Sequence, residues 1–248
     1  MNFLIALMLW SPPQALSPAP VPGPHIAGLL ERLACAPLGL PAPPVAGLRV
    51  LGGHIHGRYM FGPGEATIIS GGTNQGVQRG QQFFVRRVVA DNSTKQPKTG
   101  GLYGVHTAGW VTIVDAKENM AVASVTHACD GILEGDYLEP YTAPVLPTVS
   151  LSGAPDFEHP GQIVLADERR QTGYPGLVMM MNRGTDHAVR AGQGVTIYRE
   201  TLGGQGPIVD VGRATVVSAN PQSSIVHITS MRDVIYLGDM VAIHRITP

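Results

Sequence analysis

Short apolar runs alternate with glycine, proline and small polar residues along most of the chain, and two long stretches share one such pattern. Residues 109–141 have the pattern of strand, turn, strand, turn, strand, and residues 212–244 repeat it without a gap. Apolar and β-branched runs that are bounded by turn residues at roughly 8–12-residue intervals predict an all-β sandwich or barrel. We therefore expect one β module that is used twice.

The residues before these stretches also repeat, at a slightly different offset. Gly64 corresponds to Gly176 and Arg87 to Arg199, and the change of offset falls in the connection between Val89 and Gly109. Length variation belongs in a loop between paired strands. We expect two tandem small β-barrel or sandwich modules, each with about six or seven strands. The predicted boundaries are 1–19 for a signal peptide, 20–47 for a proline-rich spacer with a short helix, 48–141 for module one, 142–154 for a linker and 155–248 for module two.

Local patterns predict the elements at the start of the chain. Apolar residues at helical spacing predict an amphipathic helix over residues 25–34, and the proline- and glycine-rich residues 38–45 are typical of a connector. A first strand is expected over 48–51, followed by a turn at the next two glycines. Residues 71–76 have the composition of a tight connection, and the β-branched and aromatic run 82–89 indicates a strand.

A glycine–aspartate pair recurs at the same place in both modules, as Gly135-Asp136 and Gly238-Asp239. An aspartate in such a turn accepts hydrogen bonds from nearby backbone N–H groups. The pair keeps its position while its surroundings change, so we interpret it as structural rather than catalytic.

Composition narrows the class of protein. The 248 residues include 31 glycines and 21 prolines. Of all residues, 44% are hydrophobic and 14% are charged, and the net charge of the chain is −1. The apolar content suffices for buried cores. A near-neutral chain generates no field that attracts nucleic acid, so no nucleic-acid partner is expected.

The N-terminus has an apolar run from Phe3 to Trp10, which is too short to span a bilayer but has the length of a signal-peptide core. Ser17-Pro18-Ala19 supplies small residues for cleavage, although no Lys or Arg precedes the run. The alternatives are a disordered apolar N-terminus or a wrongly assigned start codon. Export predicts a periplasmic or cell-surface protein without a transmembrane segment after signal removal.

The chain has two cysteines, Cys35 and Cys129. In an exported protein an even pair favours a disulfide, and this one would attach the N-terminal segment to module one. Two unpaired buried thiols are the alternative. His127 lies two residues before Cys129, so both would face the same side of a strand.

Histidines offer a possible metal site. His54 and His56 would share one face of a strand, and His106 and His127 are further candidate ligands for a metal-dependent barrel enzyme. Exposed loop histidines are the simpler interpretation, because module two lacks the pair. We find no catalytic grouping and expect no enzyme activity, no metal and no cofactor.

Two other surfaces are candidates for binding. Residues 91–101 are polar and contain glycine and proline, which predicts an exposed loop that module two lacks at this length. The candidate binding residues at this loop are Asp91, Asn92, Lys95, Lys98 and Tyr103. A third possibility is carbohydrate or peptidoglycan binding on a stacking platform of Trp110, Tyr103 and Tyr59, although such aromatic residues more often belong to a core.

Two segments also resemble a known family. Residues 61–87, FGPGEATIISGGTNQGVQRGQQFFVRR, and residues 106–141, HTAGWVTIVDAKENMAVASVTHACDGILEGDYLEPY, resemble the C-terminal β domain of flagellar assembly protein T. They are also similar to domains that accompany LysM modules in bacterial envelope proteins, including the secretin-associated protein of type IV pili. The resemblance covers about 48–141 and, more weakly, 161–245. It implies a non-enzymatic structural or adaptor piece of a periplasmic ring or secretin collar, with envelope or appendage proteins as partners. The 248 residues contain no LysM segment, so peptidoglycan binding does not follow from the resemblance.

Overall fold

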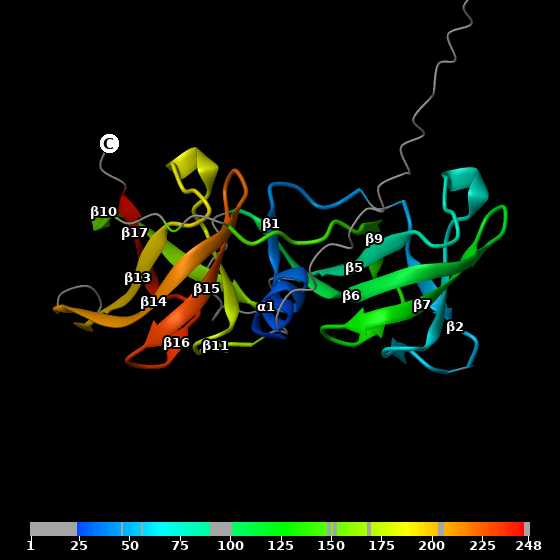
Figure 1. Cartoon of the computed structure of the whole chain (residues 1–248), viewed down its shortest axis with the longest axis horizontal. Coiled ribbons are helices and arrows are strands. Elements are labelled where there is room, and N and C mark those ends of the chain that lie inside the picture. Colours follow the sequence, from blue (N-terminus) through cyan, green and yellow to red (C-terminus); the bar gives the residue numbers. More distant parts are fainter. Residues whose placement is uncertain are drawn as a thin grey trace, which may run out of the picture.

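Strands form most of the chain in the computed structural model, which describes residues 24–45, 47–55, 57–89, 101–147, 150, 153–167, 170–202 and 206–245. One α-helix, α1 (Pro24–Ala34), precedes them (Figure 1). The predicted all-β class with a short N-terminal helix is therefore confirmed. Among these residues, no helix has both the length and the apolar character needed to cross a membrane.

The first sheet is antiparallel and follows the helix. Its strands lie in the order β2 (Val50–Gly53), β4 (Ala66–Ile69), β7 (Ala121–Ala128), β6 (Tyr103–Ala116), β5 (Gln82–Val88) and β9 (Tyr137–Pro140). β1 (Leu38–Leu40) pairs with the start of β6, and β3 (Met60–Phe61) forms a short ribbon with β8 (Ile132–Leu133). A single bridge between Arg49 and Tyr137 joins the two ends of the sheet.

The second sheet is a closed barrel with the same strand order. It runs through β10 (Ala154–Ala166), β12 (Val178–Met181), β15 (Ser224–Met231), β14 (Ile208–Ala219), β13 (Gly194–Glu200) and β17 (Met240–Arg245). β11 (Thr172–Gly173) and β16 (Ile235–Tyr236) form the counterpart of the β3–β8 ribbon. The barrel closes because β10 pairs along its length with both β12 and β17. The much shorter β2 pairs with β4, and only the Arg49–Tyr137 bridge and backbone hydrogen bonds of Leu48 and Val50 link it to the β9 side. The expectation of a closed barrel thus applies fully to the second sheet only.

Alternating residues fill the inside of each sheet. The first core includes Ile69, Val85, Val111, Ile113 and Val125, all at most 2% exposed. The second core is larger. It includes one wholly buried methionine, Met179 on β12, and two wholly buried isoleucines, Ile197 on β13 and Ile243 on β17. Each such side chain contributes about 1.5–3 kcal/mol of burial free energy.

Two local predictions were wrong, whereas the tight connection expected at 71–76 is present. The connector at 38–45 contains a strand, β1, whose backbone pairs with β6. β2 begins at Val50 and continues through the glycines that were expected to form a turn. A bulge between Val50 and Gly52, where Gly52 has a φ of 137°, shifts the register, and both glycines stay paired with β4. Residues 71–76 contain a 3-10 turn, η1 (Thr73–Gln75), whose counterpart in the barrel is η3 (Thr185–His187).

Both 3-10 turns dock on the hairpin opposite them. The backbone N–H of Thr73 donates to the Lys117 carbonyl over 2.8 Å, and Thr185 donates to Asn220 over the same distance. The preceding residues, Gly72 and Gly184, are extended, but a Cβ on either would overlap the same hairpin carbonyls. The repeated glycines are therefore required by close approach of two backbones.

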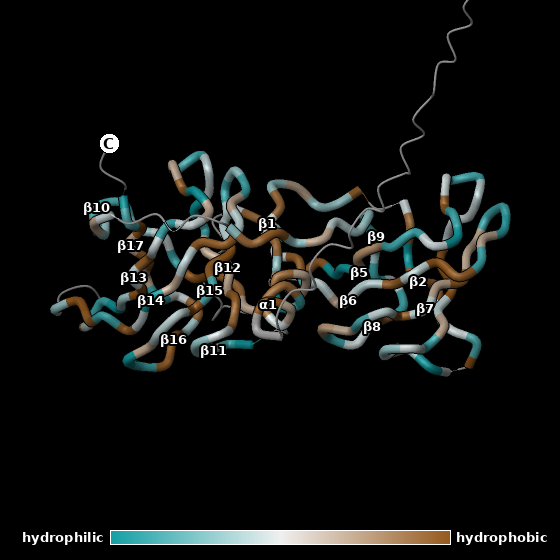
Figure 2. Tube along the Cα trace, in the orientation of Figure 1, coloured by the Kyte–Doolittle hydropathy of each residue, from teal (hydrophilic) through white to brown (hydrophobic). Residues whose placement is uncertain are grey.

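The segment formed by α1 and β1 lies between the two sheets (Figure 1) and contacts both of them. On one side β1 pairs with β6, and the Thr107 hydroxyl donates to the Ala36 carbonyl over 3.0 Å. On the other side Leu33 and Ala36 pack against the outer face of the barrel, on Val164, Leu165, Val178, Met180, Val217 and Ile225. Figure 2 shows hydrophobic stretches in β1 and α1, between the two sheets. We call this segment, residues 24–40, together with its contacts to both sheets, the seam.

Candidate functional site

A disulfide anchors the seam to the first sheet. Cys35 follows α1 and Cys129 follows β7; their Sγ atoms are 2.00 Å apart and their Cα atoms 5.6 Å apart. The bond closes a loop with a sequence separation of 94, for which the chain-entropy model gives about 4.7 kcal/mol of stabilisation. The two cysteines are thus paired, and the alternative of two free thiols does not apply to this structure.

His127 lies beside this disulfide on the same face of β7. The nearest ligand atoms of Cys35, His127 and Cys129 are all within 4.8 Å of one another. From α1, Glu31 places its Oε1 3.6 Å from His127 Nε2. The indole ring of Trp110 stacks on the imidazole with ring centroids 4.4 Å apart, which fixes the plane of the histidine. Helix and strand together therefore gather two sulfurs, one imidazole and one carboxylate.

Trp110 and His127 belong to a larger group on the outer face of the first sheet. We define the aromatic patch as Phe84, Trp110, His127 and Tyr141. Phe84 and Trp110 are cross-strand partners, and their neighbours Val85 and Val111 point into the core, so the patch lies on the opposite face.

A buried arginine supports the aromatic patch. The Arg86 guanidinium lies 4.5 Å from the centroid of the Phe84 ring and its Nε lies 2.9 Å from Glu139 Oε2. Burial lowers the pKa of Arg86, while the Glu139 carboxylate acts in the opposite direction. Burial and the same carboxylate raise the pKa of Tyr137 to about 12, so the tyrosine stays neutral in the physiological range.

The barrel carries polar residues at the positions of the aromatic patch. The counterparts are Thr196, Arg213, Ser230 and His244. The Thr196 hydroxyl lies 2.9 Å from His244 Nε2 and accepts a hydrogen bond from Arg213 over 3.1 Å. Burial, and then Arg213, lowers the pKa of His244. The two sheets share a scaffold but present different chemistry on this face.

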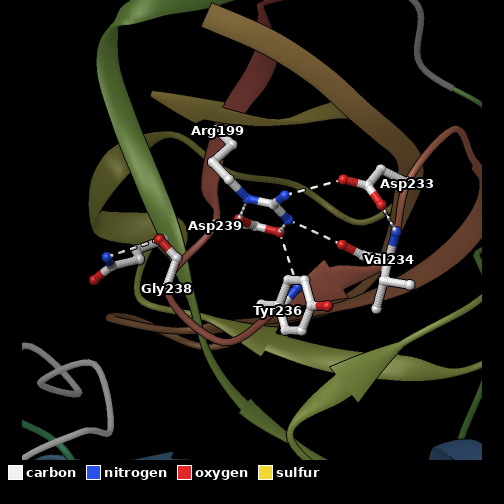
Figure 3. Close-up of polar contacts among 7 residues, drawn as sticks. Arg199, Asp233, Val234, Tyr236, Gly238 and Asp239 are labelled. Atoms are coloured by element: carbon white, nitrogen blue, oxygen red, sulfur yellow. Dashed lines mark hydrogen bonds and ion pairs between the residues drawn. The ribbon is translucent and has the colours of Figure 1, made fainter. Parts of the chain in front are cut away.

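A repeated arginine–aspartate pair accounts for the Gly-Asp motif. In the barrel, Arg199 donates from Nε and Nη2 to the two carboxylate oxygens of Asp239, both over 2.8 Å (Figure 3). Asp239 also accepts from the backbone N–H of Tyr236. In the first sheet Arg87 and Asp136 repeat this geometry at 2.7 Å, with the Leu133 N–H as the backbone donor. The aspartates therefore act in turn structure, as the sequence pattern indicated.

The histidines of the hypothetical metal enzyme do not come together in the described residues. β2 ends at Gly53, so His54 lies in an exposed bend rather than on a strand, and His56 is outside the described residues. His106 is 5% exposed on β6, opposite Arg87. Within the described ranges, the only group of three or more candidate ligands is Cys35, His127 and Cys129.

Four of the five candidate loop residues, Asp91, Asn92, Lys95 and Lys98, are also outside the described residues. Tyr103 is described; it begins β6, lies opposite Leu40 and is 44% exposed. The stacking platform suggested by the sequence does not form as one surface. Tyr103 and Trp110 are on one strand, separated by about 23 Å at the usual rise per residue.

A cleft of about 340 Å³ opens at one end of the first sheet. It is lined by Leu48, Gln75, Gly76, Val77, Gln81, Gln82, Phe83 and Pro140. Its amide side chains already have partners: Gln75 accepts from the Gly72 N–H and Gln81 from the Gln78 N–H, both close to 2.9 Å. The cleft is thus lined by groups that hold the neighbouring turns.

Neither the family models nor the curated proteins with which the chain was compared contain a match to it.

The features that sequence reasoning missed are Glu31 beside His127, and the aromatic patch with Arg86. The alternation of Phe84 with core residues and the shared strand face of His127 and Cys129 were visible signals. Nothing in the sequence indicated that α1 lies against β7.

Proposed function

We propose that the protein is a non-enzymatic, exported structural or adaptor component of a bacterial cell envelope, acting in a pilus, secretin or flagellar assembly. The observation that carries this proposal is the seam. A disulfide, a strand pairing and an apolar contact hold one N-terminal segment against both sheets. Two β units fixed in this way are suited to holding partners at a constant spacing.

Export is supported by the disulfide, because such bonds form and persist in oxidising compartments. The apolar run from Phe3 to Trp10, which lies outside the described residues, would supply the signal. The test is a fusion of the full chain to alkaline phosphatase, which is active only after export. We expect activity that is lost on deletion of residues 1–19. An inactive fusion of the intact chain would contradict export.

Partner binding is proposed at the connection between β5 and β6. Connections of unequal length on a shared scaffold commonly carry function. The counterpart hairpin of the barrel has exposed apolar residues, with Leu202 81%, Ile208 52% and Val209 45% exposed. Both regions could serve partners that add extended backbone or loop contacts.

A photo-crosslinking amino acid at Tyr103 tests this proposal in living cells. Tyr174, on the barrel, is a matched control because it has the same exposed fraction of 44%. We expect crosslinks from position 103 to pilus, secretin or flagellar proteins, identified by mass spectrometry, and a loss of these proteins from pull-downs when residues 91–101 are deleted. Crosslinks to cytosolic proteins only, or unchanged recovery after the deletion, would refute the assignment.

Peptidoglycan or carbohydrate binding is the second candidate, and the aromatic patch favours it. Trp110 and Tyr141 are half-buried on the outer face of the first sheet, whereas the barrel has polar residues there. Sedimentation with purified sacculi tests it. Binding that is lost in Trp110→Ala and retained in Arg213→Ala would support this function; no sedimentation of the native chain would exclude it.

A further inference from the structure

The disulfide site has the donors of a metal centre. Glu31 and Cys35 are one helical turn apart on or next to α1, so they face the same side of it. His127 and Cys129 are two residues apart at the end of β7 and share a strand face. Two elements, each contributing two donors, thus meet at one point. We infer that in its reduced state the chain binds one Zn²⁺ ion through Cys35, Cys129, His127 and Glu31.

Three of the four donors are close enough for a tetrahedral site, and Glu31, which lies beside His127 but outside this group, has to rotate toward the sulfurs to complete it. Zinc–ligand bonds of about 2.0–2.3 Å place neighbouring ligand atoms roughly 3.3–3.8 Å apart. His127 Nε2 and Glu31 Oε1 are already 3.6 Å apart. The sulfur and imidazole donors lie within 4.8 Å of one another, so a small rotation of side chains brings them to the required spacing.

The surroundings also suit a zinc ligand set. Cys35 is 7% exposed and His127 is partly exposed, which leaves an entry path beside a largely dry sulfur. Trp110 stacks on the imidazole and restrains its orientation before any ion arrives, as supporting contacts do around zinc ligands. Ser230 and Arg232 replace His127 and Cys129 in the barrel, so the donor set is confined to the first sheet.

The chemistry is balanced by one named reductant. A dithiol transfers two electrons and two protons to the Cys35–Cys129 disulfide, and it becomes a cyclic disulfide itself. The two free thiols then lose their protons on binding Zn²⁺, so each ion bound releases two protons. The imidazole binds as the neutral base and the carboxylate as the anion. The metal would then hold α1 to β7 at the point where the disulfide holds them in the oxidised chain.

Titration of the full chain with Co²⁺ tests the inference, because cobalt in a tetrahedral thiolate site absorbs characteristically. The protein is purified oxidised and its fold is checked by near-ultraviolet circular dichroism. It is then reduced with a dithiol, which is removed before the titration. We expect one Co²⁺ per reduced chain with thiolate charge-transfer and tetrahedral ligand-field bands, displaced by Zn²⁺, and no such bands for the oxidised chain.

Variants separate this site from incidental binding. In the reduced state His127→Ala should weaken Co²⁺ binding at least about tenfold. Loss of a residue that only supports a metal ligand already costs about this much affinity, and loss of a ligand should cost no less. His159→Ala, at a histidine 74% exposed on the barrel, should leave the affinity unchanged. Both variants keep the disulfide, so their folding is verified before reduction. Octahedral bands without thiolate absorption, equal affinity in His127→Ala, or a reduced chain that unfolds and is not restored by Co²⁺ would each overturn the inference.

Discussion

Replacing Asp136 with alanine removes three hydrogen bonds at once. Its carboxylate accepts two from Arg87 and one from the Leu133 N–H, all between 2.7 and 2.8 Å, while its side chain is 3% exposed. Breaking a buried ion pair by removing one partner costs about 3–5 kcal/mol. Arg87 is 20% exposed and keeps only the Gly131 carbonyl at 3.0 Å and Asp130 at 3.7 Å. We therefore expect a loss of about 3–4 kcal/mol.

The same substitution in the barrel should cost less. Arg199 is 33% exposed and, without Asp239, still donates to Asp233 over 3.1 Å and to the Val234 carbonyl over 2.9 Å. Solvent and these two acceptors compensate the charge, so Asp239→Ala should cost about 2 kcal/mol, typical of lost hydrogen bonds to a charged group.

Equilibrium unfolding in urea measures both costs. A Trp10→Phe background leaves Trp110 as the sole tryptophan, so its fluorescence reports on the first sheet, and circular dichroism reports on the whole chain. Asp136→Asn should be milder than Asp136→Ala, because the amide oxygen still accepts one hydrogen bond. The reasoning fails if Asp239→Ala costs as much as Asp136→Ala, or if both cost less than about 0.5 kcal/mol, the level of a neutral surface change.

Three further predictions concern packing and pH. Gly72→Ala should destabilise the first sheet by about 2 kcal/mol, because its Cβ meets the backbone of the hairpin at Lys117; unfolding in urea measures this, and an unchanged midpoint would refute it. A hydrogen bond from the Arg245 side chain lowers the pKa of Asp156 to about 2. Asp156 therefore stabilises the fold above its unfolded pKa near 4, and this contribution is lost as the pH falls from 4 through 2. Asp156→Asn should flatten that part of the acid denaturation curve. Burial, and then Arg32 of the seam, lowers the pKa of His227, so stability should decrease as the pH falls below about 6.5. His227→Gln should reduce this decrease in pH-dependent melting and leave the part that is due to His244, whose pKa is also lowered.

The sequence predicted what depends on local pattern and repetition. Turn spacing identified the β class, and the repeat aligned Arg87 with Arg199 and Asp136 with Asp239 before any contact between them was known. The repeat did not predict that the arginine and the aspartate of each unit form an ion pair. Each pair joins a strand to a turn more than 39 residues away, and only the closure of the sheet brings the two together.

The seam was only partly predictable. The apolar spacing of α1 and the two cysteines indicated a segment attached to the first sheet, but residues 38–40 have a composition typical of a connector. They form β1 because β6 extends past β7, whose pairing ends at Gly109, and so offers an unpaired backbone edge on that side. Strand formation there depends on the partner more than on intrinsic propensity. The packing of Leu33 on the barrel likewise depends on the relative placement of two sheets, which periodicity does not encode.

The seam also has a consequence for the order of folding. The first described element of the chain has partners that are distant in the sequence: Cys35 bonds to a residue 94 positions further on, and Arg32 hydrogen-bonds to a carbonyl 144 positions away. Contacts of such long sequence separation slow folding, since loop closure must precede the stabilisation that they bring. The apolar face of α1 therefore stays uncovered until most of the chain is available. We therefore expect the N-terminal segment to complete its contacts late in folding, although it is synthesised first.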